Sequence, residues 1–548
     1  MFLEIITLSS LEKVFLEKNL SASEVLKSGS MFKNEIYSFQ VAYKLHSNGH
    51  RRVPCKVEIE SELTDFIQVN TVGLVPSEFP CHPDADENYL RKEPGLFPDP
   101  LYELQDQTLY LVEEYWRSLW IRVKPSEEVL PGTYPIKILF KTEEEILNSI
   151  VFEVTILNAK LPKQKLIHTE WFHSDCIADY YKVKVFSEEH WNLMKKFIKM
   201  ATEYGINMIL TPVFTPPLDT AIGGERTTVQ LVKVIKDKDK YTFDFSLLER
   251  WIQMCQRCGV EYFEIAHLFT QWGAKHAPKI MGYEQGTYKQ LFGWETDATG
   301  EEYQGFLQQF FMHLLPVIEK YKLQDYCYFH ISDEPRQEHL ENYKAAVANV
   351  EEVLEGYPII DALSNYDFYK NKIVKRPIPA NNHIEPFLEN KVPHLWTYYC
   401  CSQYKEVSNR FFAMPSARNR IIGVQLYKYN IVGFLHWGYN FWNAQFSAFS
   451  INPFQVTDCD RAFPSGDPFL VYPGKEGPIP SIRLLVFHEA LQDLRAMQYL
   501  ETLKGKEFVI QLIEEGLSEE ITFKQYPKET QYLLKLREKI NKGIMKNI

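Results

Sequence analysis

The spacing of hydrophobic residues along the chain changes character near residue 160. Before that point, short runs in which apolar and polar residues alternate are separated by turn signals such as Pro131-Gly132. Alternation with a period of two, rich in β-branched and aromatic residues, is typical of half-buried strands. We expect six strands, in the segments 35–45, 55–61, 66–75, 110–125, 134–141 and 149–157. This pattern predicts a β-sandwich domain over residues 1–162.

From residue 163 onwards, short apolar runs alternate with amphipathic helical patterns. The helix predicted over 187–204 begins at Ser187, a good N-terminal cap, and ends before Gly205. We expect eight parallel strands, in the segments 166–173, 206–212, 260–268, 325–332, 357–364, 394–400, 431–437 and 469–473. The resulting α/β fold is a closed (β/α)8 TIM-like barrel over residues 163–510, preceded by the N-terminal β-sandwich and followed by a C-terminal helical extension over 511–548.

Polar and aromatic residues gather directly after these apolar runs. Because the chemistry of (β/α)8 barrels takes place at the carboxyl ends of the strands, these residues are the candidates for a functional site. The opposite end of the expected barrel offers nothing comparable. The carboxylate of Glu170 follows the first run. The candidates for binding a ligand are Trp171, His173, His267, Trp272, Trp396, Tyr398, Trp437, Tyr439 and Asn440.

The sharpest feature is the pair Asp333-Glu334, in the segment HISDEP after the fourth run. Two carboxylates that end a buried strand are costly unless they are solvated, paired or functional. Like charges held close together resist ionising together, so one carboxyl keeps its proton while the other loses it, as acid–base chemistry requires. A structural interpretation is also open, in which Asp333 caps a helix whose first residue is Pro335.

Adjacent carboxylates suit one kind of glycoside hydrolysis better than others. Most glycosidases hold two carboxyl groups about 5 to 5.5 Å or about 6.5 to 9.5 Å apart, across the scissile bond. Neighbouring residues, whose Cα atoms are about 3.8 Å apart, more naturally lie on one side of a ligand. The 2-acetamido group of the sugar can then act as the nucleophile, with Asp333 stabilising the acetamide N–H. Glu334 would protonate the leaving oxygen and later deprotonate a water molecule.

Several segments of the chain resemble glycoside hydrolase family 123, the β-N-acetylgalactosaminidases. They are HISDEP (330–335), LWTYYCC (395–401), GFLHWGYNFW (433–442) and GDPFLVYPGKEGPIPSIRL (466–484), within roughly residues 166–499. The resemblance implies that Asp333 is the acetamide stabiliser and Glu334 the acid/base. It implies that Tyr398 and Trp437 hydrogen-bond or stack on the sugar, with packing in the barrel wall as the alternative.

The same resemblance makes Arg483 a residue that clamps its loop or reaches a carboxylate. The sequence departs from the family pattern at Pro468, where a glycine is expected, and in the final helix, which reads HEALQDLRAM instead of a more acidic segment. These departures leave the identity of the sugar open.

Composition excludes several other classes of protein. The formal net charge of −12 argues against nucleic acid as a partner. The start of the chain lacks a signal-peptide pattern, and no apolar stretch approaches the length of about 18 residues that a membrane span requires, so we expect a cytoplasmic protein without a membrane partner. The nine cysteines form no disulfide or zinc pattern. We expect neither a metal nor a cofactor, and the oligomeric state stays open.

The sequence thus predicts an exo-acting β-N-acetylgalactosaminidase or hexosaminidase, which retains anomeric configuration and takes a glycan or glycolipid-derived sugar as substrate. Two alternatives remain. In the first, the barrel is that of a retaining or inverting glycosidase for sugars without the acetamide, in which Glu334 works with a carboxylate from another strand such as Glu170. In the second, the chain is a non-catalytic carbohydrate-binding protein.

Overall fold

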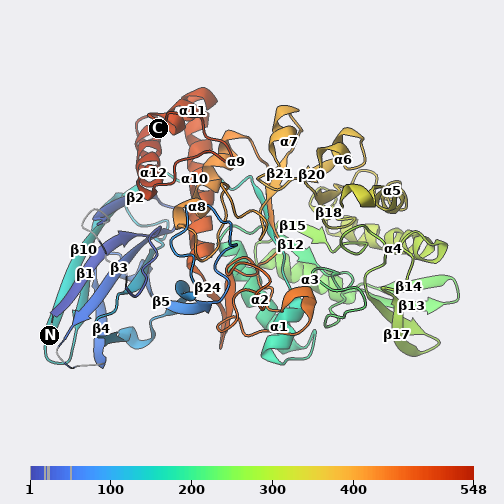
Figure 1. Ribbon diagram of the computed structural model, residues 1–548, viewed down its shortest axis with the longest axis horizontal. Helices are drawn as coiled ribbons and strands as arrows, with labels where there is room; N and C mark the ends of the chain where they lie inside the picture. Colours follow the sequence, from blue (N-terminus) through green and yellow to red (C-terminus); the bar gives the residue numbers. More distant parts are fainter. Residues whose placement is uncertain (1, 18–19, 21–24, 48, 50–51) are drawn as a thin grey trace.

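The structure is a computed structural model that describes residues 2–17, 20, 25–47, 49 and 52–548. Its N-terminal part consists of two five-stranded sheets, at the left of Figure 1. The first has the order β1 (Phe2–Ser9), β3 (Tyr37–His46), β8 (Arg117–Val123), β5 (Ile67–Ser77) and β6 (Gly95–Glu103). The second has the order β2 (Ser28–Phe32), β10 (Ile146–Leu157), β9 (Gly132–Lys141), β4 (Arg52–Glu60) and β7 (Thr108–Val112).

The two sheets share one apolar core. Phe39 of β3 stacks on Phe152 of β10 with ring centroids 3.9 Å apart, and Val41, Leu119 and Ile138 are fully buried in the same cluster. Inward-facing apolar residues on both sheets are what the alternating sequence pattern predicts. Three strands were missing from that prediction, namely β1, β2 and β6, each of which is an edge strand, and the single strand predicted over 110–125 is two strands, β7 and β8, in different sheets. β6 carries two prolines and β2 is rich in Ser and Gly, both of which are tolerated at an edge and weaken the strand signal.

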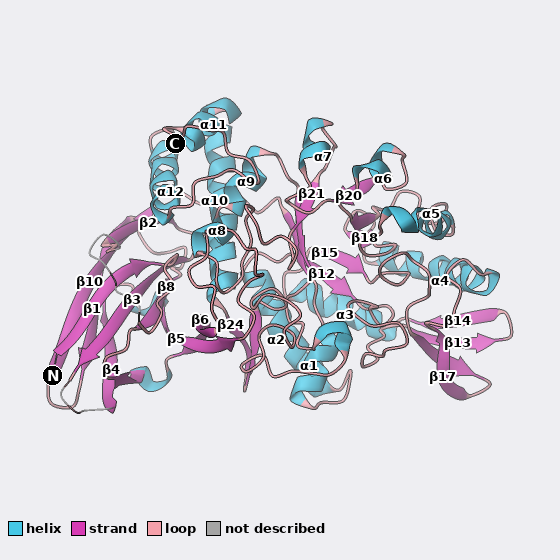
Figure 2. Cartoon of the chain, in the orientation of Figure 1, coloured by secondary structure: helices cyan, strands magenta, loops and turns pink. Residues whose placement is uncertain are grey.

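The second part of the chain contains a six-stranded parallel sheet (Figure 2, centre). Its order is β18 (Cys327–Phe329), β15 (Tyr262–Ile265), β12 (Met208–Thr211), β11 (Ile167–Glu170), β22 (Gly433–His436) and β21 (Trp396–Tyr398). A parallel pair, β19 (Ile360–Ala362) and β20 (Arg376–Ile378), lies beside it. Single parallel bridges join this pair to β18 through Phe329 and Ile359 and to β21 through Ala380 and Tyr398.

For the parallel strands, two predictions are corrected by the structure. The segment expected as the eighth parallel strand is β23 (Val471–Gly474), which pairs antiparallel with β24 (Gly477–Pro480) in a hairpin outside the parallel sheet. The sequence analysis missed β20, a strand of three residues that contains a proline. Such a short run has too few residues to show a hydrophobic period.

Helices connect the parallel strands and cover the sheet, as in an α/β fold (Figure 1). Ser187 caps α2 by accepting a hydrogen bond from the backbone N–H of His190, as predicted. The connecting helices are α1 (Ser174–Tyr181), α2 (Glu188–Glu203), α3 (Ser246–Arg257), α4 (Glu301–Lys320), α5 (Leu340–Ala348), α6 (Tyr366–Lys370), α7 (Glu385–Glu389), α8 (Ser416–Arg420), α9 (Ile422–Lys428) and α10 (Ile482–Lys504). A four-stranded sheet, which the sequence analysis did not predict, projects at the right of Figure 2 and comprises β13 (Lys233–Asp237), β14 (Lys240–Asp244), β16 (Ile280–Glu284) and β17 (Thr287–Phe292).

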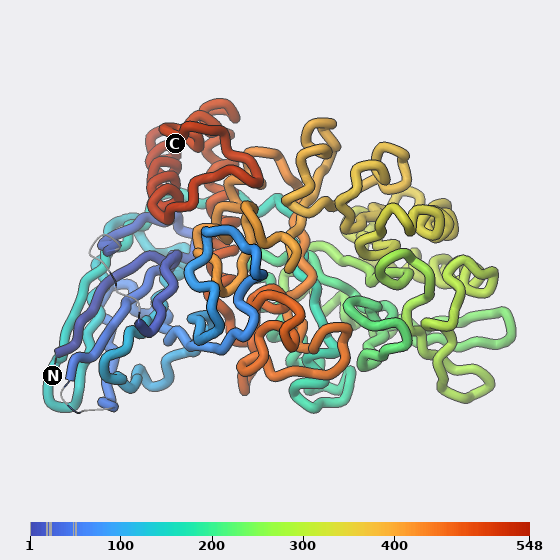
Figure 3. The backbone as a smooth tube through the Cα atoms, in the orientation of Figure 1, coloured from blue at the N-terminus to red at the C-terminus, as the bar shows by residue number. Residues whose placement is uncertain are grey.

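The chain ends beside the sandwich, so that both termini lie on the same side of the molecule (Figure 3). The last helices are α11 (Lys506–Glu514), which contains the expected domain boundary at residue 510, and α12 (Thr530–Met545). Arg537 of α12 forms ion pairs with Glu35 in the sandwich and with Asp493 of α10. These contacts fix the sandwich against the second part of the chain.

Arg483, on α10, makes a second buried connection between the two parts. Its guanidinium donates to both carboxylate oxygens of Asp99 at 2.8 and 2.9 Å, and to the carbonyls of Gly466 and Phe469. The residue therefore both clamps the loop that precedes β23 and reaches a carboxylate of the sandwich. Within the described residues, no helix is long and apolar enough to cross a membrane.

Candidate active site

A pocket opens at the carboxyl ends of the parallel strands, where polar and aromatic residues were expected to gather. Its volume is about 120 Å³, on a scale where one water molecule needs about 10 to 15 Å³. It therefore has room for a ligand of about one sugar ring. The pocket is lined by Trp171, Leu218, Asp219, Gln271, Trp272, Asp333, Glu334, Ala362, Tyr398, Cys400, Cys401, Leu435, Trp437 and Phe463.

Asp333 lies just after β18 and is 7% exposed. Its backbone carbonyl accepts a hydrogen bond from the N–H of Trp272 at 3.0 Å. Its side-chain Oδ2 accepts one from Nε2 of Gln271 at 2.8 Å, and Gln271 lines the pocket as well. The loop that follows the neighbouring strand β15 thus holds both the backbone and the carboxylate of Asp333.

Glu334 follows in the left-handed region of the backbone, with φ 45°. Its N–H donates to the carbonyl of Ala362 at 3.0 Å, and its Oε1 accepts a hydrogen bond from the hydroxyl of Tyr398 at 2.7 Å. In an extended strand the side chains of neighbouring residues point to opposite faces. The positive φ of Glu334 breaks this alternation, and both carboxylates line the same pocket.

The alternative in which Asp333 caps a helix is wrong. The next helical turn, Gln337–His339, begins after Arg336, and the side chain of Asp333 is hydrogen-bonded to Gln271 instead of to a helix N-terminus. Pro335 is buried in the loop that follows β18. The pair therefore faces a cavity and makes no capping contact.

The surroundings of Asp333 favour its protonated form. Burial, and then the charge of the adjacent Glu334, raise the pKa of Asp333 to about 8, against the opposing effect of the Gln271 hydrogen bond. Burial and the charge of Glu334 also raise the pKa of Tyr398 well above its ordinary value, so the phenol remains a donor. With its pKa raised to about 8, Asp333 retains its proton near neutral pH.

Aromatic side chains form much of the pocket wall. The indole N–H of Trp171 donates to Glu264 at 2.8 Å, and that of Trp437 donates to Asp467 at 2.8 Å. Trp272 is 37% exposed, which is unusual for so large an apolar ring. A fixed ring with one open face can pack against the C–H face of a sugar.

A buried polar network supports the pocket from below. His330 donates to Glu264 through Nε2 and lies 3.3 Å from Asp361 through Nδ1. Although burial lowers the pKa of His330, the charge of Glu264 raises it to about 9. The carboxylate of Asp361 also accepts hydrogen bonds from the N–H of Ile331 and from the hydroxyl of Tyr343. This network fixes the end of β18, from which Asp333 and Glu334 project.

Two of the candidate histidines lie outside the pocket lining. His267 is buried, stacks on His330 with ring centroids 4.3 Å apart and contacts the edge of Trp171. His173 contacts the carbonyl of Trp437 through Nε2 and Arg226 through Nδ1, and burial followed by the Arg226 charge lowers its pKa to about 3. Both rings support residues of the pocket wall and do not face the cavity.

Four further candidates are also placed away from the cavity. Tyr439 donates to the carbonyl of Phe197, and Asn440 exchanges hydrogen bonds with the backbone of His173. Trp396 packs against the backbone of Gly433, where any Cβ would lie 2.0 Å from the indole. Arg483 binds Asp99, as described above. The candidates that do line the pocket are Trp171, Trp272, Asp333, Glu334, Tyr398 and Trp437.

Glu170 is engaged elsewhere. Both of its oxygens accept hydrogen bonds from Arg410, at 2.6 and 2.9 Å, and His168 lies 3.1 Å from Oε1. Although burial raises the pKa of Glu170, the Arg410 charge lowers it to about 2. A fully buried, doubly bound carboxylate is poorly suited to act as the partner of Glu334.

Sequence reasoning missed several residues of the pocket, the most important of which is Asp219. This residue lies in the loop after β12 with φ 40°, and its Oδ2 accepts a hydrogen bond from the N–H of Phe446 at 3.0 Å. Burial raises its pKa to about 6. It follows its strand by eight positions instead of directly, so a search limited to strand ends could not find it. Searched over the residues that the structure describes, no group of three or more His, Cys, Asp or Glu side chains is arranged to hold a metal ion.

Comparison with known proteins agrees with this geometry. The model of the family described as glycoside hydrolase 123, catalytic domain, matches residues 171–500, which is more than half of the chain. A family 123 glycoside hydrolase from Clostridium perfringens, studied for glycolipid glycan hydrolysis, is similar in structure with a TM-score of 0.76 at 17% identity, over 99% of this chain and 98% of that one.

More distant matches share little of the fold. A GH5 xyloglucanase from Bacteroides ovatus has a TM-score of 0.32 at 8% identity, covering 85% of this chain and 98% of that one. A chitinase from a Paenibacillus species has a TM-score of 0.20 at 8% identity, over 73% and 33% of the two chains. No curated protein sequence matches the chain significantly. The match to the family model shows that this chain belongs to glycoside hydrolase family 123.

Proposed function

We propose that the chain is an exo-acting β-N-acetylgalactosaminidase that hydrolyses its substrate with the help of the sugar's own 2-acetamido group and with retention of configuration. One observation carries the proposal. Asp333 and Glu334 line the same pocket from adjacent positions, and each is held by a neutral donor, Gln271 or Tyr398. Two carboxylates on one side of a ligand leave the opposite side of the anomeric carbon to a nucleophile that the substrate carries.

In the proposed reaction the acetamide oxygen attacks the anomeric carbon, and the bond to the leaving oxygen breaks. Asp333 accepts a hydrogen bond from the acetamide N–H and stabilises the positive charge of the oxazolinium that forms. Glu334 donates its proton to the leaving oxygen. In the second half, Glu334 removes a proton from water, which attacks the anomeric carbon and reopens the ring of the intermediate.

The proton that the acid pair shares must be on Glu334 when the bond breaks. Burial by itself raises the pKa of Asp333 and favours its protonated form. A substrate N–H that binds Asp333 adds a donor to its carboxylate, which favours the ionised form. Substrate binding would therefore transfer the shared proton to Glu334, the residue that needs it.

The size of the pocket supports action on a terminal sugar. About 120 Å³ accommodates one ring, with the aromatic wall of Trp171, Trp272 and Trp437 around it. Asp219 supplies a carboxylate that can accept hydrogen bonds from hydroxyl groups of the same ring. We further propose that the eight strands joined by the two bridges form a closed (β/α)8 barrel, which would place all these residues around one mouth.

The natural substrate in this proposal is a glycan of the glycolipid type. The structurally similar Clostridium perfringens enzyme hydrolyses glycolipid glycans. That enzyme is only 17% identical to this chain, so the similarity suggests the class of substrate and leaves the linkage open.

A panel of aryl β-glycosides that differ only at C2 and C4 tests the proposal. We expect turnover of the 2-acetamido-galactoside, weaker turnover of the gluco epimer, and none of the plain galactoside. A thiazoline analogue of the oxazoline should inhibit strongly, because it resembles the bound intermediate. Hydrolysis of the plain galactoside without inhibition by the thiazoline would show that the acetamide takes no part.

One observation favours a second candidate function. Asp219 is a further carboxylate in the pocket, so Glu334 could work with Asp219 as an ordinary carboxylate pair on a sugar that lacks the acetamide. In that case Asp219→Asn would abolish turnover of a plain galactoside. Under the main proposal the same variant raises KM for the acetamido substrate and leaves kcat within about tenfold, since it loses a hydroxyl contact and no reacting group.

A further inference from the structure

Two exposed aromatic rings, those of Trp272 and Phe446, meet at the edge of the pocket that holds Asp333 and Glu334. Their ring centroids are 6.1 Å apart, and the rings lie edge to face. Trp272 lines the pocket, whereas Phe446 does not, so the ring of Phe446 extends the aromatic surface beyond the pocket. Trp272 is 37% exposed and Phe446 is 41% exposed. An apolar surface therefore continues from the pocket to the outside of the protein.

The backbone of each of these two aromatic residues is bound to a carboxylate residue of the pocket. The N–H of Trp272 donates to the backbone carbonyl of Asp333 at 3.0 Å. The N–H of Phe446 donates to Oδ2 of Asp219 at 3.0 Å, and the hydroxyl of Ser447 donates to the backbone carbonyl of Asp219 at 2.7 Å. The two rings therefore have fixed positions relative to the residues that would contact the sugar in the pocket.

Both aromatic residues have a backbone conformation that large side chains rarely adopt. The φ angle is 55° at Trp272 and 57° at Phe446, in the left-handed region that favours glycine. Residues in this region cost free energy, and they occur most often at sites that bind ligands. A bulky apolar ring that stays exposed at such a position recovers little of this cost by packing in the core. Burial within the protein therefore does not explain why these positions are aromatic.

The small size of the pocket means that most of a longer substrate lies outside it. A volume of about 120 Å³ accommodates about one sugar ring. In the proposed reaction Glu334 protonates the oxygen that joins this ring to the next one, so the next ring leaves the pocket beside Glu334. Trp272 lines the same pocket and is bound to Asp333, the residue before Glu334. The leaving sugar therefore emerges beside the aromatic surface.

We propose that Trp272 and Phe446 form a second sugar subsite, which binds the sugar ring on the leaving side of the scissile bond. The C–H face of that ring would pack against the exposed aromatic surface. The proposal rests on the proposed function, because the bond that is cleaved sets the position of the subsite. It makes Phe446 a specificity-determining residue, which selects substrates by the sugar next to the terminal one.

Two substrates with the same terminal sugar test this proposal on the full chain. In one, 2-acetamido-galactose is β-linked to galactose, which would occupy the subsite, and the other is the methyl β-glycoside of the same acetamido sugar, which would leave the subsite empty. The ratio of kcat/KM for the disaccharide to kcat/KM for the methyl glycoside measures the preference. We expect a preference of about tenfold or more, since packing on an aromatic face contributes on that scale. Equal kcat/KM values in the wild type would overturn the proposal.

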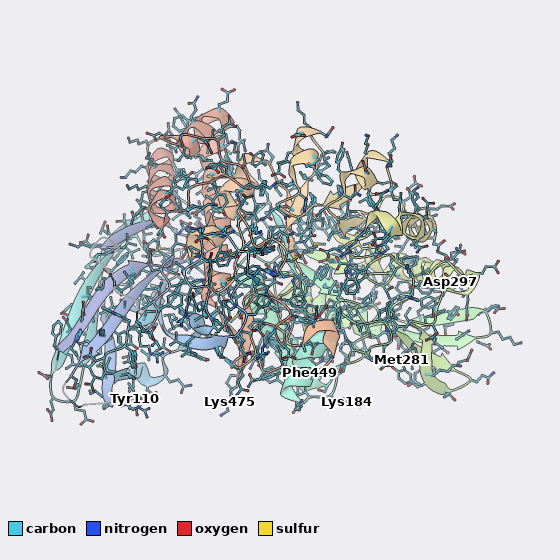
Figure 4. The ribbon with its side chains drawn as sticks, in the orientation of Figure 1. Tyr110, Lys184, Met281, Asp297, Phe449 and Lys475 are labelled. Carbon is cyan, nitrogen blue, oxygen red and sulfur yellow. The ribbon has the colours of Figure 1, made fainter. Side chains whose placement is uncertain are left out.

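Substitution of Phe446 identifies the residue responsible. Phe446→Ala removes the ring and should lower the preference for the disaccharide about fivefold or more, whereas Phe446→Tyr retains a ring and should keep the preference. Tyr110→Ala is the matched control, because Tyr110 is 51% exposed but lies on β7 of the sandwich, at the lower left of Figure 4. It should leave the preference unchanged. The same preference in Phe446→Ala as in the wild type would contradict the subsite.

Two further substrates separate related outcomes. If the octyl glycoside is preferred over the methyl glycoside as strongly as the disaccharide is, and Phe446→Ala removes this preference too, the rings bind any apolar group and the sugar subsite is wrong. If the wild type hydrolyses only the corresponding pair of plain galactosides, the proposed function is wrong. The preference within that pair, in the wild type and in Phe446→Ala, then tests the subsite by the same criterion.

Discussion

Tyr398 donates a hydrogen bond of 2.7 Å from its hydroxyl to Oε1 of Glu334, across 64 positions of the sequence. The phenol comes from the end of β21 and the carboxylate from the residue after Asp333, so the contact joins two strand ends across the pocket. It leaves Oε2 of Glu334 for the leaving oxygen. This hydrogen bond makes Tyr398 a positioning residue for Glu334, the proposed general acid.

Removal of this hydroxyl in Tyr398→Phe should lower kcat by about tenfold to a hundredfold with little change in KM. A charge-assisted hydrogen bond to a partly buried carboxylate is worth about 1.5 to 3 kcal/mol. Steady-state kinetics on an acetamido aryl glycoside measure the effect. Tyr399→Phe is the matched control, because its ring is buried behind the wall and it does not line the pocket. Equal losses in both variants would contradict a specific role of Tyr398.

Glu334→Gln should distinguish leaving groups. Turnover of a natural glycoside should fall by about a thousandfold or more, because the leaving alkoxide then departs without a proton. An aryl glycoside with an acidic phenol needs no such help and should retain much more of its turnover. Rates on both substrates provide the comparison, and equal loss on the two would remove the acid role of Glu334.

Asp333→Asn should abolish most turnover on both substrates and stabilise the fold. Asp333 has a pKa raised to about 8, so between about pH 4 and pH 8 the folded state binds a proton that the unfolded state lacks. Stability therefore falls as the pH rises through this range, and the loss is complete above pH 8. The asparagine variant carries no such charge, so its gain in unfolding free energy should be near zero at pH 4 and on the order of 1 to 3 kcal/mol at pH 8.5.

Denaturation of the wild type and Asp333→Asn at pH 4, 6 and 8.5 measures this difference. Asp367→Asn, at an exposed residue of α6, is a control that should show no such trend. A variant that is less stable than the wild type at pH 8.5 would mean that Asp333 is held mainly by favourable contacts, and that its ionisation is not costly.

Glu170→Gln should lower stability more than catalysis. The pKa of Glu170 is held at about 2 by Arg410, so its ionised form stabilises the fold above its ordinary pKa, and this contribution is lost as the pH falls towards 2. Leaving Arg410 buried without its partner costs about 3 to 5 kcal/mol. We therefore expect a large drop in Tm at pH 7 that becomes smaller towards pH 3, with kcat of the folded enzyme nearly unchanged. Loss of kcat at unchanged Tm would restore Glu170 as a catalytic candidate.

Much of the architecture could be predicted from local sequence. The change from period two to alternating strands and helices placed the sandwich and the parallel strands, because side chains alternate along a strand and recur every three to four residues along a helix. Some of the strands that escaped prediction were edges or very short runs, such as β6 and β20, and the whole sheet of β13, β14, β16 and β17 was missed as well. In β6 and β20, prolines and a short length remove the alternation of apolar and polar residues that burial of one face of a strand normally produces.

For the site, the sequence alone determined which residue types end the strands, and it identified the adjacent pair Asp333-Glu334. Only the tertiary structure decided which of these groups face a cavity and which are taken up by partners, as Glu170 is by Arg410 from 240 positions away. The pocket also gained Asp219, which reaches it through a loop. The physical reason is that a side chain's charge and hydrogen bonds depend on distant neighbours, whereas a strand depends on the residues beside it in the chain.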